Sequence, residues 1–140
     1  MGEVFQNSHF ALAVHTLTAL SIRKRMTSSE LAQSVNTHPT FLRSLLGRLK
    51  EAGLVEVKMG KGGGAALARP AKQITLLDVY RATDAGPNAC HHSEPSSECV
   101  VGRNILGVLD GVMGEVEAAV EETLARRTVA DVARKVKRRG

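Results

Sequence analysis

The side chains with the most distinctive chemistry lie between residues 85 and 99, in the stretch AGPNACHHSEPSSEC. This stretch holds both cysteines of the chain, Cys90 and Cys99, and two adjacent histidines, His91 and His92. Thiolates and imidazoles are common ligands of transition metals, and two thiols can form a disulfide. A loop of this length in a small domain is usually functional or disordered, so these residues are candidates for a functional site.

Four interpretations of this loop stay open from its residues. Cys90 and Cys99 could form a disulfide, which in the cytosol is usually regulatory. A metal could be held by Cys90, His91 or His92, and Cys99, although their spacing is not that of a standard zinc site. An organic effector could bind between the loop and the helix after it, or the two cysteines could be ordinary residues of a mobile loop.

A second group of side chains is suited to contact DNA. At about 100° per residue along residues 39–52, the leucines fall on one face of a helix and predict its buried side. The opposite face carries small residues and hydrogen-bond donors, which suit close approach to bases and phosphates in a major groove. The predicted DNA contacts, with the preceding turn and the following loop included, are Thr37, Thr40, Arg43, Ser44, Arg48, Lys50, Lys58 and Lys61.

The elements around these residues have the order of a winged helix-turn-helix. Thr27 and Glu30 have the spacing of a capping box at the start of a short helix. Gly53 is placed to end the second helix in a left-handed conformation. Residues 54–57 and 65–69 then predict a two-stranded ribbon with a lysine- and glycine-rich tip. The order of elements carries the DNA prediction, because such a tip alone is more often a solvated hairpin, and the phosphate-loop pattern GxxxxGK(S/T) is absent.

The longest predicted helix, about residues 101–127, has apolar residues at near-heptad spacing. They are Ile105, Leu109, Val112, Val116, Val120 and Leu124, with Gly107, Gly111, Gly114 and Ala118 beside them. Each glycine costs about 1 kcal/mol of helix stability relative to alanine, so aligned glycines indicate another backbone packed very close. Because a small domain has little chain to cover such a helix, we expect a homodimer that presents two recognition helices to two half-sites.

Three further helices are predicted from the remaining segments. Residues 8–22 are apolar almost all round, which predicts burial on most sides, with His9 and His15 as core histidines. The other two helices cover about residues 76–84 and 129–137, and each follows a threonine that can cap it, Thr75 and Thr128.

Charge separates a DNA-binding part from an association part. Residues 1–75 carry a balance of +6, residues 76–127 of −5 and residues 128–140 of +4. A basic first half indicates a nucleic-acid partner, and the basic end is either a second phosphate contact or a frayed, solvated tail. No stretch reaches transmembrane length and the start lacks the regions of a signal peptide, so we expect a cytoplasmic protein with no membrane partner.

The predicted fold class is mainly α with a small β-hairpin wing, a winged helix-turn-helix plus a long C-terminal dimerisation helix. Residues 1–84 form the predicted DNA-binding domain, residues 85–100 the sensor loop, and residues 101–140 the dimerisation helix and the short C-terminal helix. An enzyme is not expected, because we find no nucleophile–base pair with a supporting group and no paired carboxylates in a predicted cleft.

Several segments together resemble the BadM/IscR-type (Rrf-two) family of bacterial winged-helix transcription regulators. They are SSELAQ, FLRSLLGRLKEAGLVEVKMGKGGG, ALARPAKQITLLDVYRATDAG, the cysteine-containing loop and the long helix after it. The resemblance implies a homodimeric repressor or activator, with residues 39–52 in the major groove of operator DNA and the wing on the minor groove or the backbone. It also implies that the long helix forms the dimer interface.

The sequence departs from the family pattern in two places. The family usually has an aromatic residue after the paired wing glycines, where this chain has Gly64 and Ala65. Some members hold an iron–sulfur cluster on three cysteines of the loop, but Leu106 or a neighbour stands where the third is expected. A cluster would need donors from the partner subunit or from His91, His92, Glu94 or Glu98.

We therefore predict a dimeric, sequence-specific DNA-binding regulator, with repression as the expected mode, that responds to a redox or small-molecule signal through Cys90 and Cys99. No cofactor is expected, and an iron–sulfur cluster or a transition metal is the alternative. The alternative functions are an iron–sulfur- or metal-sensing regulator and a protein-interaction module that regulates a partner protein. The expected partners are operator double-stranded DNA, a second copy of the chain and, in one interpretation, a small-molecule effector.

Overall fold

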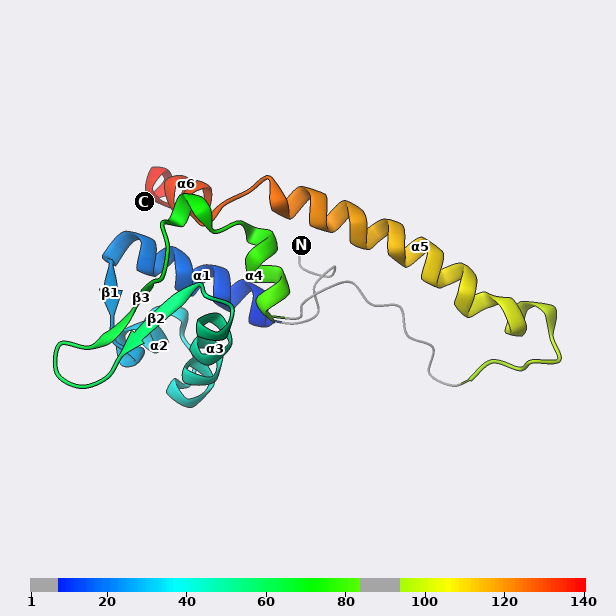
Figure 1. Cartoon of the computed structure of the whole chain (residues 1–140), viewed down its shortest axis with the longest axis horizontal. Coiled ribbons are helices and arrows are strands. Elements are labelled where there is room, and N and C mark those ends of the chain that lie inside the picture. The colour runs from blue at the N-terminus through cyan, green and yellow to red at the C-terminus, as the bar shows by residue number, and fades with distance from the viewer. Residues whose placement is uncertain (1–7, 84–93) are drawn as a thin grey trace.

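The structure, a computed structural model, describes residues 8–83 and 94–140. Its elements in chain order are α1 (Ser8–Arg23), β1 (Arg25–Met26), α2 (Ser28–Val35), α3 (Pro39–Glu51), β2 (Val55–Lys58), β3 (Gly64–Leu67), the short helical turn η1 (Ala71–Gln73), α4 (Leu76–Thr83), α5 (Val100–Ala125) and α6 (Val129–Arg139). The sheet and the shorter helices gather at one end, and α5 extends far away from them (Figure 1). None of the described helices combines the length and apolarity that crossing a membrane requires.

The helix-turn-helix begins and ends where its side-chain chemistry predicts. The Thr27 hydroxyl accepts a hydrogen bond from the Glu30 backbone N–H at 3.1 Å, and the Glu30 carboxylate accepts from the Thr27 N–H at 3.0 Å. The predicted capping box is therefore confirmed. Gly53, at φ 76°, follows the end of α3 in the left-handed region, also as predicted.

The core takes one apolar face from each element of the winged helix-turn-helix. Within α3 the predicted leucine stripe is buried, with Leu42 and Leu49 both 0% exposed. The largest fully buried apolar side chains are Leu17, Leu20, Leu31, Leu42, Leu49, Leu54, Ile74, Val79 and Val129. Because these contacts fix which side of α3 faces inward, they also fix which side faces solvent.

The predicted two-stranded ribbon is confirmed as the antiparallel pair β2–β3, and β1, which was not predicted, extends it to a three-stranded sheet. The strand order is β1–β3–β2, with Arg25 opposite Ala66 and Val57 opposite Ala65. The two residues of β1 are too few to show an alternating pattern, so this strand leaves no signal in the sequence. At Gly64, with φ 131°, a Cβ would stand 2.6 Å from the Met26 carbonyl oxygen, so only glycine allows β1 this close.

The last helix returns to the winged helix-turn-helix and packs on α1 and η1. The Val129 N–H donates to the Ile74 carbonyl at 2.9 Å, which ties the start of α6 to the segment before α4. The Thr128 hydroxyl accepts from the Asp131 N–H at 3.1 Å, so this predicted cap is confirmed. Helix α6 continues to Arg139, and residues 134–140 are all exposed, so the basic end is helical and solvated and neither alternative for it is excluded.

Helix α1 is less buried than its sequence predicts. Ile22 is 39% exposed, and His15 lies at the surface with its Nε2 3.1 Å from the Ser34 hydroxyl. The His9 ring is half-buried and lies 5.0 Å from the ring of Phe41. Both histidines therefore join α1 to the surface of the helix-turn-helix, and their prediction as core histidines is wrong.

Candidate nucleic-acid interface and sensor loop

The outward side of α3 holds most of the predicted DNA contacts. Thr40, Arg43, Ser44, Arg48 and Lys50 are all exposed. The N-terminus of α3 is fixed by the His38 ring, whose Nδ1 accepts a hydrogen bond from the Thr40 N–H at 3.1 Å, and by a proline at the first helical position. The helix therefore presents hydroxyl, guanidinium and ammonium donors on one solvent-facing side.

A groove separates α3 from the wing and gathers three of the predicted residues. Arg43 and Lys50 line it from α3, and Lys58 lines it from the end of β2. Lys61 is exposed on the wing loop. Figure 1 shows α3 and the hairpin on the same lower side of the molecule, so one duplex can lie across both.

The other predicted residues lie beside this groove. Ser44 and Arg48 face α1, where Arg48 Nη1 lies 3.4 Å from His9 Nδ1. Thr37 is half-buried in the turn between α2 and α3. The structure thus brings the residues of α3 and the wing to one side of the molecule, and Thr37 is less exposed than they are. All eight stay predictions of DNA contact.

Two residues of this surface were missed from the sequence. Ser28 lines the groove at the N-terminus of α2, where backbone N–H groups and the helix dipole favour a phosphate. Met59, on the wing, is 85% exposed, and minor-groove proteins use such apolar side chains against base steps. The capping box pointed to the α2 terminus, but only the fold shows that this terminus faces the wing.

Among the residues of the predicted sensor loop that the structure describes, Cys99 has the most reactive side chain. It is exposed and stands directly before α5. Hydrogen bonds from the backbone N–H groups of Gly102 and then Val101 lower the pKa of the Cys99 thiol below its ordinary value. Cys90, His91 and His92 lie outside the described residues, so the geometry of a disulfide or a metal site in this loop is not tested.

This lowered pKa predicts a measurable reactivity. In a Cys90→Ser variant, Cys99 is expected to react with iodoacetamide with a midpoint pH below that of the same variant unfolded in urea. The physical reason is that the thiolate is the nucleophile and persists to lower pH where backbone N–H groups stabilise it. Mass spectrometry after timed alkylation measures both pH profiles, and a folded midpoint equal to or above the unfolded one contradicts the assignment.

The donor set does not fit an iron–sulfur cluster of the usual kind. Such clusters are held mainly by four cysteine thiolates, and this chain has two cysteines. Within residues 8–83 and 94–140, no three His, Cys, Asp or Glu side chains are grouped as metal ligands. We therefore derive no step of the function from a cluster.

Helix α5 is held to the rest of the chain by its C-terminal half. The Tyr80 hydroxyl of α4 donates to the Glu117 carboxylate at 2.8 Å, and Arg81 lies 3.8 Å from Glu121. Burial, with the Glu117 carboxylate adding, raises the pKa of Tyr80 to about 12, so this donor keeps its proton at physiological pH. No residue of α5 is buried, and large apolar side chains stay exposed along its N-terminal half, namely Val100, Val101, Leu106, Val108 and Val112.

Comparisons with known proteins agree on one family. The sequence model of Rrf2, described as an iron-dependent transcriptional regulator, matches residues 6–135. The chain is 35% identical to YwnA of Bacillus subtilis, named as an HTH-type transcriptional regulator, over 90% of this chain and 95% of that protein. It is 28% identical to the regulator IscR of Cereibacter sphaeroides, over 87% and 79% respectively. A solved structure described as a DNA-binding protein superimposes with a TM-score of 0.73 at 33% identity, covering 89% of this chain and 98% of that one.

Proposed function

The chain belongs to the Rrf2 family of transcriptional regulators, and from this membership we propose that it is a homodimeric repressor that binds operator DNA through α3 and the wing. Family membership and the similar proteins identify the chain as a winged-helix, DNA-binding transcription regulator and not as an enzyme. The observation that carries the finer proposal is the arrangement of α2, α3 and the wing. Hydrogen-bond donors from all three elements line one groove on one side of the molecule, namely Ser28, Arg43, Lys50 and Lys58.

The dimer is supported by the surface of α5. Val101, Val108 and Val112 are 64%, 61% and 48% exposed. At about 100° per residue these three side chains fall on one side of α5, where they form an apolar strip. A helix of 26 residues with no buried side chain is difficult to account for in an isolated chain. Packing against the same helix of a second copy would cover the strip and set two α3 helices side by side for two half-sites.

A substitution at Gly47, on α3, is expected to change protein stability and DNA affinity in opposite directions. Gly47 lies on the outward side of the helix, and a Cβ there would meet nothing within 4 Å. Gly47→Ala is therefore expected to raise the free energy of unfolding by up to about 1 kcal/mol, since glycine is a poor helix former. The same methyl group should weaken operator binding, because it stands between the helix backbone and the bases. Urea unfolding and fluorescence anisotropy measure the two effects, and raised stability with unchanged affinity would place this side of α3 away from DNA.

The signal in this proposal is a peroxide-type oxidant in the cytoplasm, the proposed location. The oxidant accepts the two electrons and two protons that the thiols of Cys90 and Cys99 lose when they form a disulfide. Support comes from Cys99, which is exposed, has a lowered pKa and adjoins the helix proposed to hold the dimer. A bond at the start of α5 would change how the two copies are held, and hence the spacing of their α3 helices. An organic effector bound beside the same loop is the alternative signal.

The direct test of the DNA role is the dependence of duplex affinity on salt. Each neutralised phosphate contributes about −0.9 to the slope of log affinity against log salt, so six contacts predict a slope of about −5. Lys58→Gln with Lys61→Gln should make this slope shallower by about two while leaving sequence preference unchanged. A slope near zero for the unmodified protein contradicts the DNA role and favours a module that binds a protein partner.

A further inference from the structure

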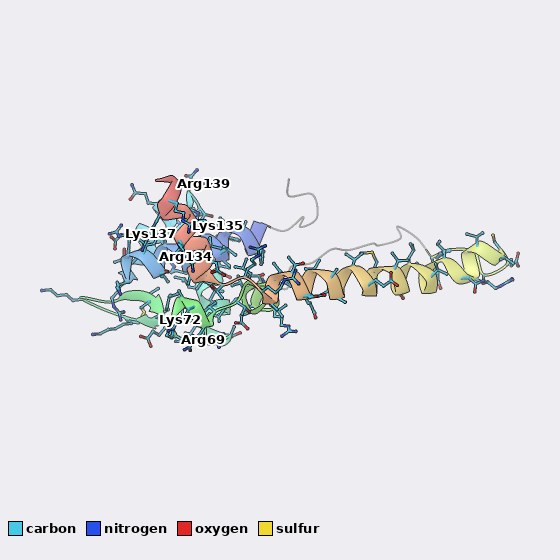
Figure 2. All side chains as sticks on the ribbon, turned by 90° about the horizontal axis from the view of Figure 1, so that it is seen from above. Arg69, Lys72, Arg134, Lys135, Lys137 and Arg139 are labelled. Carbon is cyan, nitrogen blue, oxygen red and sulfur yellow. The ribbon has the colours of Figure 1, made fainter. Side chains whose placement is uncertain are left out.

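Helix α6 carries a second basic surface. Its inward side is formed by Val129 and Ala133, which are 0% and 5% exposed. Its outward side is basic over the C-terminal half of the helix, from Arg134 to Arg139, and η1, which packs beside it, adds Lys72. We call this surface the α6 face, and its members are Lys72, Arg134, Lys135, Lys137, Arg138 and Arg139. Figure 2, seen from above, shows five of them, all but Arg138, spread over this one side of the molecule.

Within the described residues, acidic side chains neutralise little of the charge of the α6 face. Arg134 pairs with Asp131 at 3.1 Å, but its side chain stays 59% exposed. The other five cations make no ion pair with any residue of the described part of the chain. Cations in the last turn complement the helix dipole, which is equivalent to roughly half a charge. The three cations in the last turn carry more charge than the helix dipole can balance, and Lys72 and Lys135 lie outside that turn.

The position of the α6 face separates it from the operator. Figure 1 shows α6 and η1 on the upper side of the molecule, whereas α3 and the hairpin lie on the lower side. Helix α6 packs on α1, so the core of the winged helix-turn-helix lies between the two basic surfaces. A straight duplex bound to α3 and the wing therefore cannot also reach the α6 face.

The chemistry of the α6 face fits a phosphate backbone. No aromatic side chain interrupts the cations, so stacking on single-stranded bases is not available. A protein partner would need apolar or aromatic anchors. Between Arg134 and Arg139 the only apolar residue is Val136, which is 49% exposed but lies on the side of α6 toward α1, where it lines a groove, and not among the cations. The basic stretch from Arg134 to Arg139 is about 8 Å long, which spans about two phosphates of one strand at about 3.4 Å per charge, and Lys72 of η1 lies outside this stretch.

We propose that the α6 face binds the backbone of a second DNA duplex, without sequence preference, while α3 and the wing hold the operator. The protein thereby bridges two segments of DNA, and a dimer would present two such faces. This rests on the proposed function in one respect only, because the first duplex is taken to occupy α3 and the wing.

The test measures capture of a second duplex by immobilised complex. Operator duplex is fixed to a surface and saturated with protein, and a labelled duplex of unrelated sequence is then added. The neutral variant combines Lys135→Gln, Lys137→Gln, Arg138→Gln and Arg139→Gln. The unmodified protein is expected to capture the labelled duplex at about 50 mM salt and to release it by about 200 mM, and the neutral variant should capture on the order of tenfold less.

A charge-retaining variant is the matched control. It combines Lys135→Arg, Lys137→Arg, Arg138→Lys and Arg139→Lys, and it is expected to capture the second duplex as the unmodified protein does. Both variants should bind the first duplex with unchanged affinity, which also shows that they fold. Equal capture by the neutral variant and the unmodified protein overturns the proposal, as does absence of capture at low salt. Displacement of the labelled duplex by excess unlabelled duplex supports it, whereas displacement by polyglutamate alone would assign the face to an acidic protein.

Failure of the proposed function is distinguishable from failure of this inference. If α3 selects no operator, the affinities of the neutral and the charge-retaining variants for a duplex of random sequence can still be compared. Lower duplex affinity in the neutral variant alone then supports the α6 face, and equal affinity in both overturns it. Arg43→Ala provides the converse case, because it should reduce operator affinity and leave capture by the α6 face intact.

Discussion

Arg43→Ala is expected to weaken operator binding by about 5- to 150-fold and to relax selectivity at one base pair. A bidentate contact between arginine and guanine contributes about 1–3 kcal/mol of discrimination. Arg43 is exposed, lines the groove between α3 and the wing, and makes no ion pair with any described residue. Its guanidinium therefore has no structural role in the described chain that its loss would disturb, and thermal stability should stay unchanged.

Fluorescence anisotropy measures the affinity for the operator duplex, obtained by selection from a random-sequence pool, and for single-base variants of that duplex. Arg43→Lys is the matched control, since it keeps the charge but loses the bidentate geometry. If Arg43 contacts a base, Arg43→Lys should lose selectivity to the same extent as Arg43→Ala. Its loss of affinity for a duplex of unrelated sequence should be smaller, because the charge is kept. If Arg43→Ala leaves both affinity and selectivity unchanged, α3 does not read bases through this residue.

Val112→Glu together with Val108→Glu is expected to convert the dimer to a monomer and to reduce operator affinity by on the order of 10²- to 10³-fold. The two valines are 48% and 61% exposed on the apolar strip of α5. Carboxylates brought together across a two-fold interface repel each other and lose hydration that nothing replaces. A monomer engages one half-site and loses the avidity of paired binding, which accounts for the size of the effect.

Val136→Glu is the control for this substitution. Val136, on α6, is 49% exposed, so it matches Val112 in residue type and exposure but lies on another helix. It should leave the mass measured by light scattering and the operator affinity unchanged. A double α5 variant that stays dimeric, or an unmodified chain that is monomeric at micromolar concentration, contradicts the role assigned to α5.

The parts of the fold that local chemistry determines were predictable from the sequence. Thr27 and Thr128 each have an acidic residue three positions later, and both capping boxes formed. The leucine period placed the buried side of α3 correctly. Strand β1 was missed because two residues are too few to show a periodic pattern. Its pairing depends on β3, whose paired residues Ala65 and Ala66 are far from β1 in the sequence and follow Gly64.

The burial of individual side chains and their grouping into one surface were harder to predict than the helices and strands. An apolar helix such as α1 reads as buried all round, but whether a neighbour covers Ile22 depends on where α6 packs. Likewise, Arg43, Lys50 and Lys58 were each identifiable as donors, but the groove that they share with Ser28 follows from the angle between the wing and α3. Such tertiary angles leave no periodic trace in the sequence.

The most direct measurement is selection of bound duplexes from a random-sequence pool by the purified protein at physiological salt. A dimer that reads DNA with two α3 helices predicts enrichment of one two-fold symmetric sequence, with half-sites separated by a whole number of helical turns of about 10.5 base pairs. The double α5 variant should then enrich at most a single half-site. A pool that stays random after repeated selection, although the protein is folded and dimeric, contradicts sequence-specific operator binding through α3 and the wing.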